Sequence, residues 1–121
     1  MLGGKRFVVV EDEAIVAMLV EDFIVDLGGI VVATVARVAD ALALLDQTRP
    51  DAAVLDVNLA GQHSYPIADA LGARAIPYLF VTGYGEAGLD AAYRDRPVLQ
   101  KPFTCERFAR ALGQLAFSAA Q

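Results

Sequence analysis

A short stretch near the start of the chain reads Phe7-Val8-Val9-Val10-Glu11-Asp12-Glu13. Its four apolar residues in a row are typical of a parallel strand that is covered by helices on both faces. Acidic residues follow directly, so the predicted strand ends in carboxylates. The stretch therefore predicts an α/β fold whose first strand ends in acid.

The same alternation of short apolar runs and longer helical patterns continues to the end of the chain. Strands are predicted at residues 7–10, 30–35, 52–55, 78–81 and 98–100. Helices are predicted at 13–27, across 41–45, from 66 to about 72, more weakly at 88–94, and after the capping residue 104, with a loop at 57–65. Right-handed crossovers between such units predict an open parallel sheet with helices on both faces.

Length and composition are those of one domain. The 121 residues, of which 56% are hydrophobic, supply one sizeable core. We therefore expect a single domain over residues 1–121 and no output domain. No stretch approaches the roughly 18 apolar residues of a membrane span, and the first residues lack the pattern of a secretory signal. A cytoplasmic protein with no membrane partner is expected.

Charge and cysteine content exclude several kinds of site. The net charge of −5 argues against a nucleic-acid partner, because binding to phosphate backbones generally requires a basic face. It is compatible with protein partners, or with a cation held by clustered carboxylates. Cys105 is the only cysteine, so neither an internal disulfide nor a thiolate metal cluster is expected.

Polar side chains follow the predicted strands at the point where each strand ends. Glu11 and Asp12 follow the first strand, Asp56 the third, Thr82 the fourth and Lys101 the fifth. Ligands of open parallel sheets bind at the carboxyl ends of the strands, so these side chains are expected to share one crevice. Core packing alone does not predict such a set of polar residues at the strand ends.

Converging carboxylates repel one another, and a divalent cation relieves that repulsion. Mg²⁺ prefers oxygen ligands and keeps several waters, so Asp12, Asp56 and the backbone carbonyl near Asn58 are the predicted ligands. Glu11 reaches the ion either directly or through water. The sequence therefore predicts a magnesium site at this edge of the sheet.

The same residues suit the transfer of a phosphoryl group. A carboxylate attacks phosphorus to give an acyl phosphate, provided that the charge on the transferred group is neutralised. Asp56 is placed for that attack, with the ion on one oxygen of the group, the Lys101 ammonium on a second, and the Thr82 hydroxyl with nearby N–H groups on the third. Asp56 is therefore the predicted phosphoacceptor and site of modification.

Four motifs together resemble a CheY-like receiver of the response regulators: Val-Val-Val-Glu-Asp-Glu at 8–13, Leu-Asp-Val-Asn-Leu at 55–59, Phe-Val-Thr-Gly-Tyr-Gly at 80–85 and Lys-Pro-Phe at 101–103. The resemblance covers nearly the whole chain. It implies a flavodoxin-like doubly wound (βα)5 sandwich with a parallel sheet of order 2-1-3-4-5. It also implies that Glu11 and Asp12 form the acidic metal-binding pair and that Thr82 is the switch hydroxyl. Lys101 would be the lysine that senses the phosphate, with a cis peptide bond to Pro102.

The chain departs from the common receiver pattern at two positions. Glu11 stands where aspartate is frequent, which leaves its direct contact with the metal open. Val98 stands three residues before the lysine, where many receivers carry the Phe or Tyr that acts as a rotamer switch. The run Phe-Val-Thr-Gly-Tyr at 80–84 resembles instead the Phe-Ala-Thr-Gly-aromatic-Tyr motif of atypical short receivers. That subgroup implies Tyr84 as the switch aromatic, in the absence of a firm fourth helix.

The resemblance implies a phosphorylation-activated signalling switch of a two-component system or phosphorelay. A sensor histidine kinase or a histidine phosphotransfer protein would donate the phosphoryl group to Asp56 with Mg²⁺ as cofactor, and a downstream protein target would respond. The chain would catalyse only its own phosphotransfer and dephosphorylation, so it is not expected to be an enzyme. The sequence leaves open whether phosphorylation also causes the chain to form a homodimer.

Other interpretations stay open on the sequence. The fold would also serve as an interaction module that is no longer phosphorylated, or as a phosphate sink for its kinase. A metal-dependent phosphatase is disfavoured, because such enzymes require a second aspartate two residues after the nucleophile, where this chain has Asn58. A flavin site is disfavoured because no Ser/Thr-rich phosphate loop follows the first strand.

Overall fold

A computed structural model describes residues 1–83 and 89–115 of the chain. Five parallel strands form one sheet in the order β2-β1-β3-β6-β7, which confirms the predicted 2-1-3-4-5 order. The strands are β1 (Arg6–Val10), β2 (Ile30–Val35), β3 (Ala52–Asp56), β6 (Tyr78–Thr82) and β7 (Val98–Gln100). The helices are α1 (Ala14–Asp26), α2 (Val38–Gln47), α3 (Tyr65–Ala73) and α4 (Cys105–Leu112), with a 3-10 turn η2 (Ala91–Tyr93). Over the described ranges, no helix is both long and apolar enough to cross a membrane.

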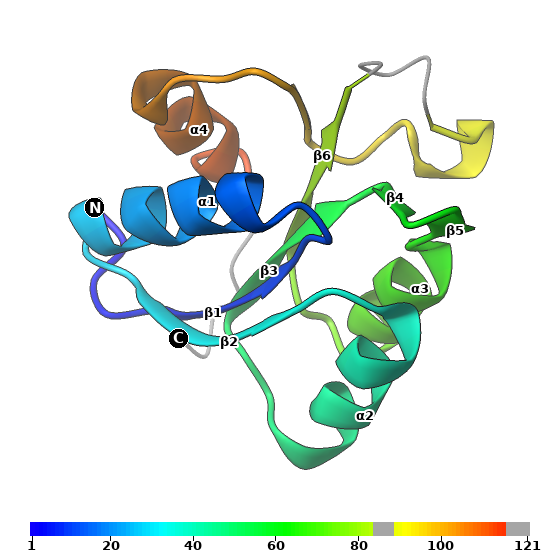
Figure 1. Cartoon of the computed structure of the whole chain (residues 1–121). Helices are drawn as coiled ribbons and strands as arrows, with labels where there is room; N and C mark the ends of the chain where they lie inside the picture. The colour runs from blue at the N-terminus through cyan, green and yellow to red at the C-terminus, as the bar shows by residue number, and fades with distance from the viewer. Residues whose placement is uncertain (84–88, 116–121) are drawn as a thin grey trace.

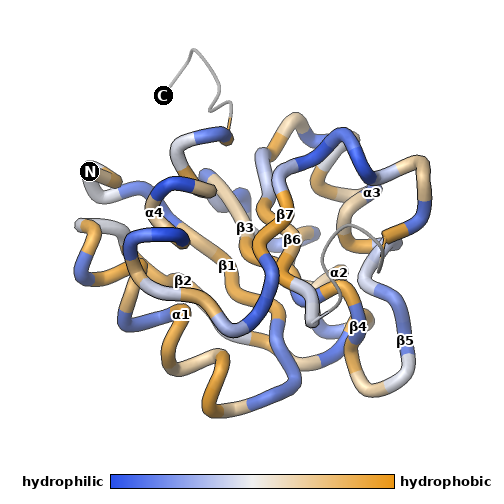
Figure 2. The backbone as a smooth tube through the Cα atoms, turned by 90° about the horizontal axis from the view of Figure 1, so that it is seen from above, coloured by the Kyte–Doolittle hydropathy of each residue, from blue (hydrophilic) through white to orange (hydrophobic). Residues whose placement is uncertain are grey.

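Both faces of the sheet are covered by helices (Figure 1), α1 and α4 on one side and α2 and α3 on the other. Successive strand residues alternate between the two cores. In β1, Val8 and Val10 pack with α2 and α3, whereas Phe7 and Val9 pack with α1 and α4. The apolar colour that follows β1 and β6 in Figure 2 has this origin. Uniformly apolar strands are therefore the sequence signature of this three-layer arrangement.

The segment 57–65, predicted to be a loop, contains a short antiparallel hairpin. Its strands are β4 (Asn58–Leu59) and β5 (Gln62–His63). The turn residues Ala60 and Gly61 have φ angles of 50° and 89°. Tight two-residue hairpins require such left-handed residues and favour Asn-Gly, so an alanine in the first place gives little signal in the sequence. The prediction of a loop is therefore wrong over these residues.

The prediction of a weak helix at 88–94 is also wrong within the described part of that range. Residues 89–94 contain only the 3-10 turn η2, and residue 88 lies outside the described residues. The turn is held on α3 by side chains: the Tyr65 hydroxyl accepts a hydrogen bond of 2.9 Å from the Asp90 amide, and the Tyr93 ring stacks on the Tyr65 ring at 4.3 Å. The Tyr93 hydroxyl donates to Asp69 at 2.8 Å. Contacts with α3 thus replace the hydrogen bonds of a longer helix.

The turn that follows helix α3 contains a left-handed residue that is not glycine. Ala75 has φ 57°, and the next amide, of Ile76, donates to the Leu71 carbonyl at 2.9 Å. This is the closure that usually places glycine at the left-handed position, where a side chain costs roughly 1 kcal/mol. We expect Ala75→Gly to raise the free energy of unfolding by about 0.5 kcal/mol in urea unfolding, because the relief of strain exceeds the added entropy of the unfolded chain.

The matched control is Ala70→Gly, which lies inside α3. A glycine there has no strain to relieve and is expected to lower the free energy of unfolding by about 1 kcal/mol. A lower free energy of unfolding in both variants would show that Ala75 is not strained.

Candidate functional site

The carboxyl ends of four neighbouring strands bring the predicted site residues together. Asp56 is the last residue of β3, Thr82 is the last residue of β6, and Glu11 directly follows β1. The exposed fractions of these polar residues are only 6%, 3% and 5%, respectively. In the parallel register Thr82 pairs with Gln100, so Lys101 leaves β7 beside it, and the Lys101 amide donates to the Thr82 carbonyl at 2.8 Å. The predicted cis bond between Lys101 and Pro102 is confirmed.

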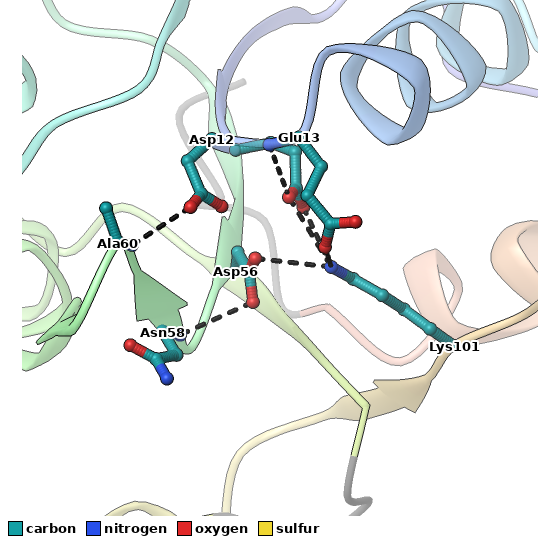
Figure 3. A network of polar contacts seen from close by, with 7 residues as sticks. Asp12, Glu13, Asp56, Asn58, Ala60 and Lys101 are labelled. Carbon is teal, nitrogen blue, oxygen red and sulfur yellow. Dashed lines mark hydrogen bonds and ion pairs between the residues drawn. The ribbon is translucent and has the colours of Figure 1, made fainter.

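The Lys101 ammonium lies among three carboxylates (Figure 3). Its Nζ is 3.2 Å from Asp56 Oδ2, 3.3 Å from Glu11 Oε2 and 3.1 Å from Glu13 Oε1, and its side chain is 16% exposed. Burial disfavours the ammonium, but the hydrogen bond with Glu13 and the charges of Asp56 and Glu11 outweigh that effect and raise the pKa of Lys101. The lysine therefore remains a cation that is fixed against Asp56.

Glu11 is the most strongly perturbed carboxyl group of the site. Burial first, then the hydrogen bond and the negative charge of Asp56, raise the pKa of Glu11 to about 8. The Glu13 amide and the Lys101 charge act in the opposite direction, and that amide donates to Glu11 Oε1 at 3.2 Å. Burial and the neighbouring Asp56 together thus outweigh the stabilising effect of Lys101 and the Glu13 amide on the Glu11 carboxylate.

Asp12 points away from the lysine, toward the hairpin (Figure 3). Its Oδ2 accepts a hydrogen bond of 2.9 Å from the Ala60 amide, and the Asn58 amide donates to Asp56 Oδ1 at 3.3 Å. The hairpin therefore forms one wall of the site and Lys101 the other.

An open cavity of about 510 Å³ lies between these walls, lined among others by Asp12, Glu13, Asp56, Asn58, Gly83 and Lys101. Carboxylate oxygens of Glu11, Asp12, Glu13 and Asp56 all lie within 4.8 Å of one another. Clustered carboxylates that are only partly neutralised suit a hard divalent cation, which takes oxygen ligands and keeps some of its waters. The donor set therefore fits Mg²⁺.

Glu13 belongs to the site, although the sequence predicted it only as the first residue of a helix. It is the N-cap residue of α1, but its side chain makes no capping hydrogen bond and contacts Lys101 instead. The one available signal was that it is the third acid of the run that follows β1. Tyr84, the predicted switch aromatic, lies outside the described residues.

Comparison with known proteins gives the family of this chain. The family model described as the response regulator receiver domain matches residues 7–112. The chain belongs to the response regulator receiver family. This receiver is therefore a domain of two-component signalling, a class of phosphorylation-regulated switches rather than typical enzymes. A search of curated proteins found no significant match.

Solved structures of other receivers resemble this one over nearly their whole length. The solution structure of SdrG from Sphingomonas melonis Fr1 is 48% identical, covers 93% of this chain and 97% of that chain, and has a TM-score of 0.84. The BeF3-activated conformation of SdrG from Pseudomonas melonis Fr1 is 47% identical over the same shares, with a TM-score of 0.80. The PhyR receiver domain of Erythrobacter litoralis is 26% identical, covers 99% of this chain and 98% of that chain, and has a TM-score of 0.80.

Proposed function

We propose that this receiver accepts a phosphoryl group on Asp56 from a sensor histidine kinase or a histidine phosphotransfer protein, and signals through contacts with other proteins. The observation that carries the proposal is the Lys101 ammonium, 3.2 Å from Asp56 Oδ2 at the mouth of an acidic cavity. A buried carboxylate beside a fixed cation is a nucleophile with charge compensation already in place.

The transfer is a displacement at phosphorus. A carboxylate oxygen of Asp56 forms the new bond, the bond between phosphorus and the donor imidazole nitrogen breaks, and the nitrogen keeps the electron pair. The product is an acyl phosphate on Asp56. Two contacts orient the carboxylate before the reaction, the Asn58 amide at Oδ1 and Lys101 at Oδ2. Lys101 then neutralises charge on the oxygens of the transferred group.

We assign Mg²⁺ to the acidic side of the same cavity. Asp12 and Asp56 would hold it together with the backbone carbonyl of Asn58 and water, and Glu11 would contact it directly or through water. When bound, the ion supplies positive charge that offsets the charge of the phosphoryl oxygens. The crowding of acidic groups around Asp56 supports this assignment.

The exposed face of α1 is the proposed contact for the donor protein. Ile15 and Met18 are 83% and 62% exposed, and they follow the acidic residues of the site within the first turns of the helix. Exposed apolar side chains grouped beside a reactive site are typical of a protein interface. A donor that covers them would bring its phosphohistidine to Asp56.

The response to phosphorylation is proposed to run through Thr82. Thr82 is buried at the end of β6, beside the end of β3 that carries Asp56, and its hydroxyl would move together with Lys101 toward the phosphoryl group. Such a movement would shift the equilibrium of the surface between β6 and α4, with Tyr84 as the aromatic that reports it. A downstream target, or a second copy of this chain, would bind the shifted state. An alternative is a phosphate sink for the kinase.

The test is the response of the full chain to beryllofluoride with Mg²⁺, followed by ¹H–¹⁵N NMR. We expect large shifts for amides at the site, including Asn58, Gly83 and Lys101, and much smaller shifts with Mg²⁺ alone. The SdrG relative has been solved in a BeF3-activated conformation, which supports this expectation. An unchanged spectrum would favour the rival function, an interaction module that is no longer phosphorylated.

A further inference from the structure

Two adjacent acidic side chains of the site contact different groups (Figure 3). Asp12 accepts from the Ala60 amide of the hairpin at 2.9 Å, whereas Glu13 accepts from Lys101 Nζ at 3.1 Å. Glu13 also lines the cavity that contains Asp56. Asp12 therefore belongs to the hairpin side of the cavity, and Glu13 belongs to the lysine side.

The three carboxylates around Lys101 differ in how easily they can leave it. The side chains of Glu11 and Asp56 are 3% and 8% exposed, so their oxygens have little access to water. The side chain of Glu13 is 63% exposed. It starts at the N-cap of α1, where no capping hydrogen bond restrains it. Glu13 is thus the one member of the trio that can move into solvent at little cost.

We propose that Glu13 is a positioning residue that occupies Lys101 before phosphorylation and competes with the phosphoryl group for its ammonium. This inference rests on the proposed function of Asp56 and Lys101. A phosphoryl group on Asp56 adds anionic oxygens next to Lys101, and Glu13 places another negative charge beside them. The ammonium must then exchange its contact with Glu13 for a contact with phosphoryl oxygen, so Glu13 lowers the affinity of the site for the transferred group.

The experiment is a beryllofluoride titration of the full chain at saturating Mg²⁺, followed by NMR, for the wild type and Glu13→Gln. Removing one like charge beside an anion is expected to tighten beryllofluoride binding by about 5-fold. The matched control is Asp22→Asn, which removes the same charge from an exposed residue farther along α1. It is expected to bind as the wild type does, which separates the local effect from the change in net charge.

A second measurement separates competition for the lysine from a role at the metal. In Glu13→Gln the affinity for Mg²⁺ alone is expected to fall by no more than about 2-fold, because Glu13 contacts Lys101 and contributes only its charge to the group of carboxylates. A larger fall in Mg²⁺ affinity would make Glu13 a metal ligand and overturn the inference. Equal or weaker beryllofluoride binding would do the same, since it would mean that Glu13 is neutral or helps to hold the lysine in place.

These outcomes are distinct from a failure of the proposed function. If the wild-type chain does not respond to beryllofluoride, both the proposed function and the inference about Glu13 are wrong. If the wild type responds but Glu13→Gln does not bind beryllofluoride more tightly, only the inference about Glu13 is wrong. Asp56 then remains the proposed acceptor.

Discussion

Asp56→Asn is expected to abolish the uptake of a phosphoryl group from acetyl phosphate in the presence of Mg²⁺. The amide is a poor nucleophile and carries no charge to pair with the ion or with Lys101, which lies 3.2 Å from Asp56 Oδ2 in the wild type. We expect the rate to fall by at least roughly 10³-fold, which corresponds to about 4 kcal/mol in activation free energy. The measurement is the intact mass of the protein over time, where the wild type gains one phosphoryl group.

The control for this variant is Asp40→Asn. It makes the same chemical change on the exposed side of α2, where Asp40 pairs with Arg37 at 3.3 Å. This variant is expected to be phosphorylated at the wild-type rate, and the NMR spectrum of each variant shows whether it is folded. Modification of folded Asp56→Asn at an unchanged rate would mean that another carboxylate is the acceptor.

The fold could be predicted because both faces of the sheet are buried. Strands of that kind need apolar residues at every position, as in Val8 to Val10 and in Ala52 to Leu55, and such runs are easily recognised in a sequence. The hairpin of β4 and β5 was missed for the opposite reason. Its strands are two residues long, and its left-handed turn position holds Ala60 where asparagine would have been informative.

The site could be predicted as far as backbone topology decides it. Parallel strands end at one edge, so residues at the carboxyl ends of β1, β3, β6 and β7 had to meet there. The direction of each side chain is a different matter. Asp12 and Glu13 are neighbours in the chain, yet they contact the hairpin and the lysine, respectively. That separation depends on the path of the chain into α1, and spacing in the sequence does not encode it.

The second large effect is expected for Asp12→Asn, which should weaken Mg²⁺ binding by about 10- to 100-fold, or roughly 1.4 to 2.8 kcal/mol. Asparagine has the same shape and keeps an oxygen that can accept from the Ala60 amide, a bond of 2.9 Å in the wild type. The hairpin is therefore expected to stay in place while the site loses one negative charge. The measurement is an Mg²⁺ titration that follows the Asn58 and Ala60 amides by NMR.

Glu11→Gln is the comparison that gives this prediction its specificity. It removes a carboxylate one residue earlier, but Glu11 pairs with Lys101 at 3.3 Å, and burial with the neighbouring Asp56 raises the pKa of Glu11 to about 8. A carboxyl group engaged in this way contributes less to binding a cation than the exposed Asp12 does, so the loss of affinity should be smaller than for Asp12→Asn. The reverse order would place the ion on the lysine side of the cavity, and the assignment of Asp12 as a ligand would be wrong.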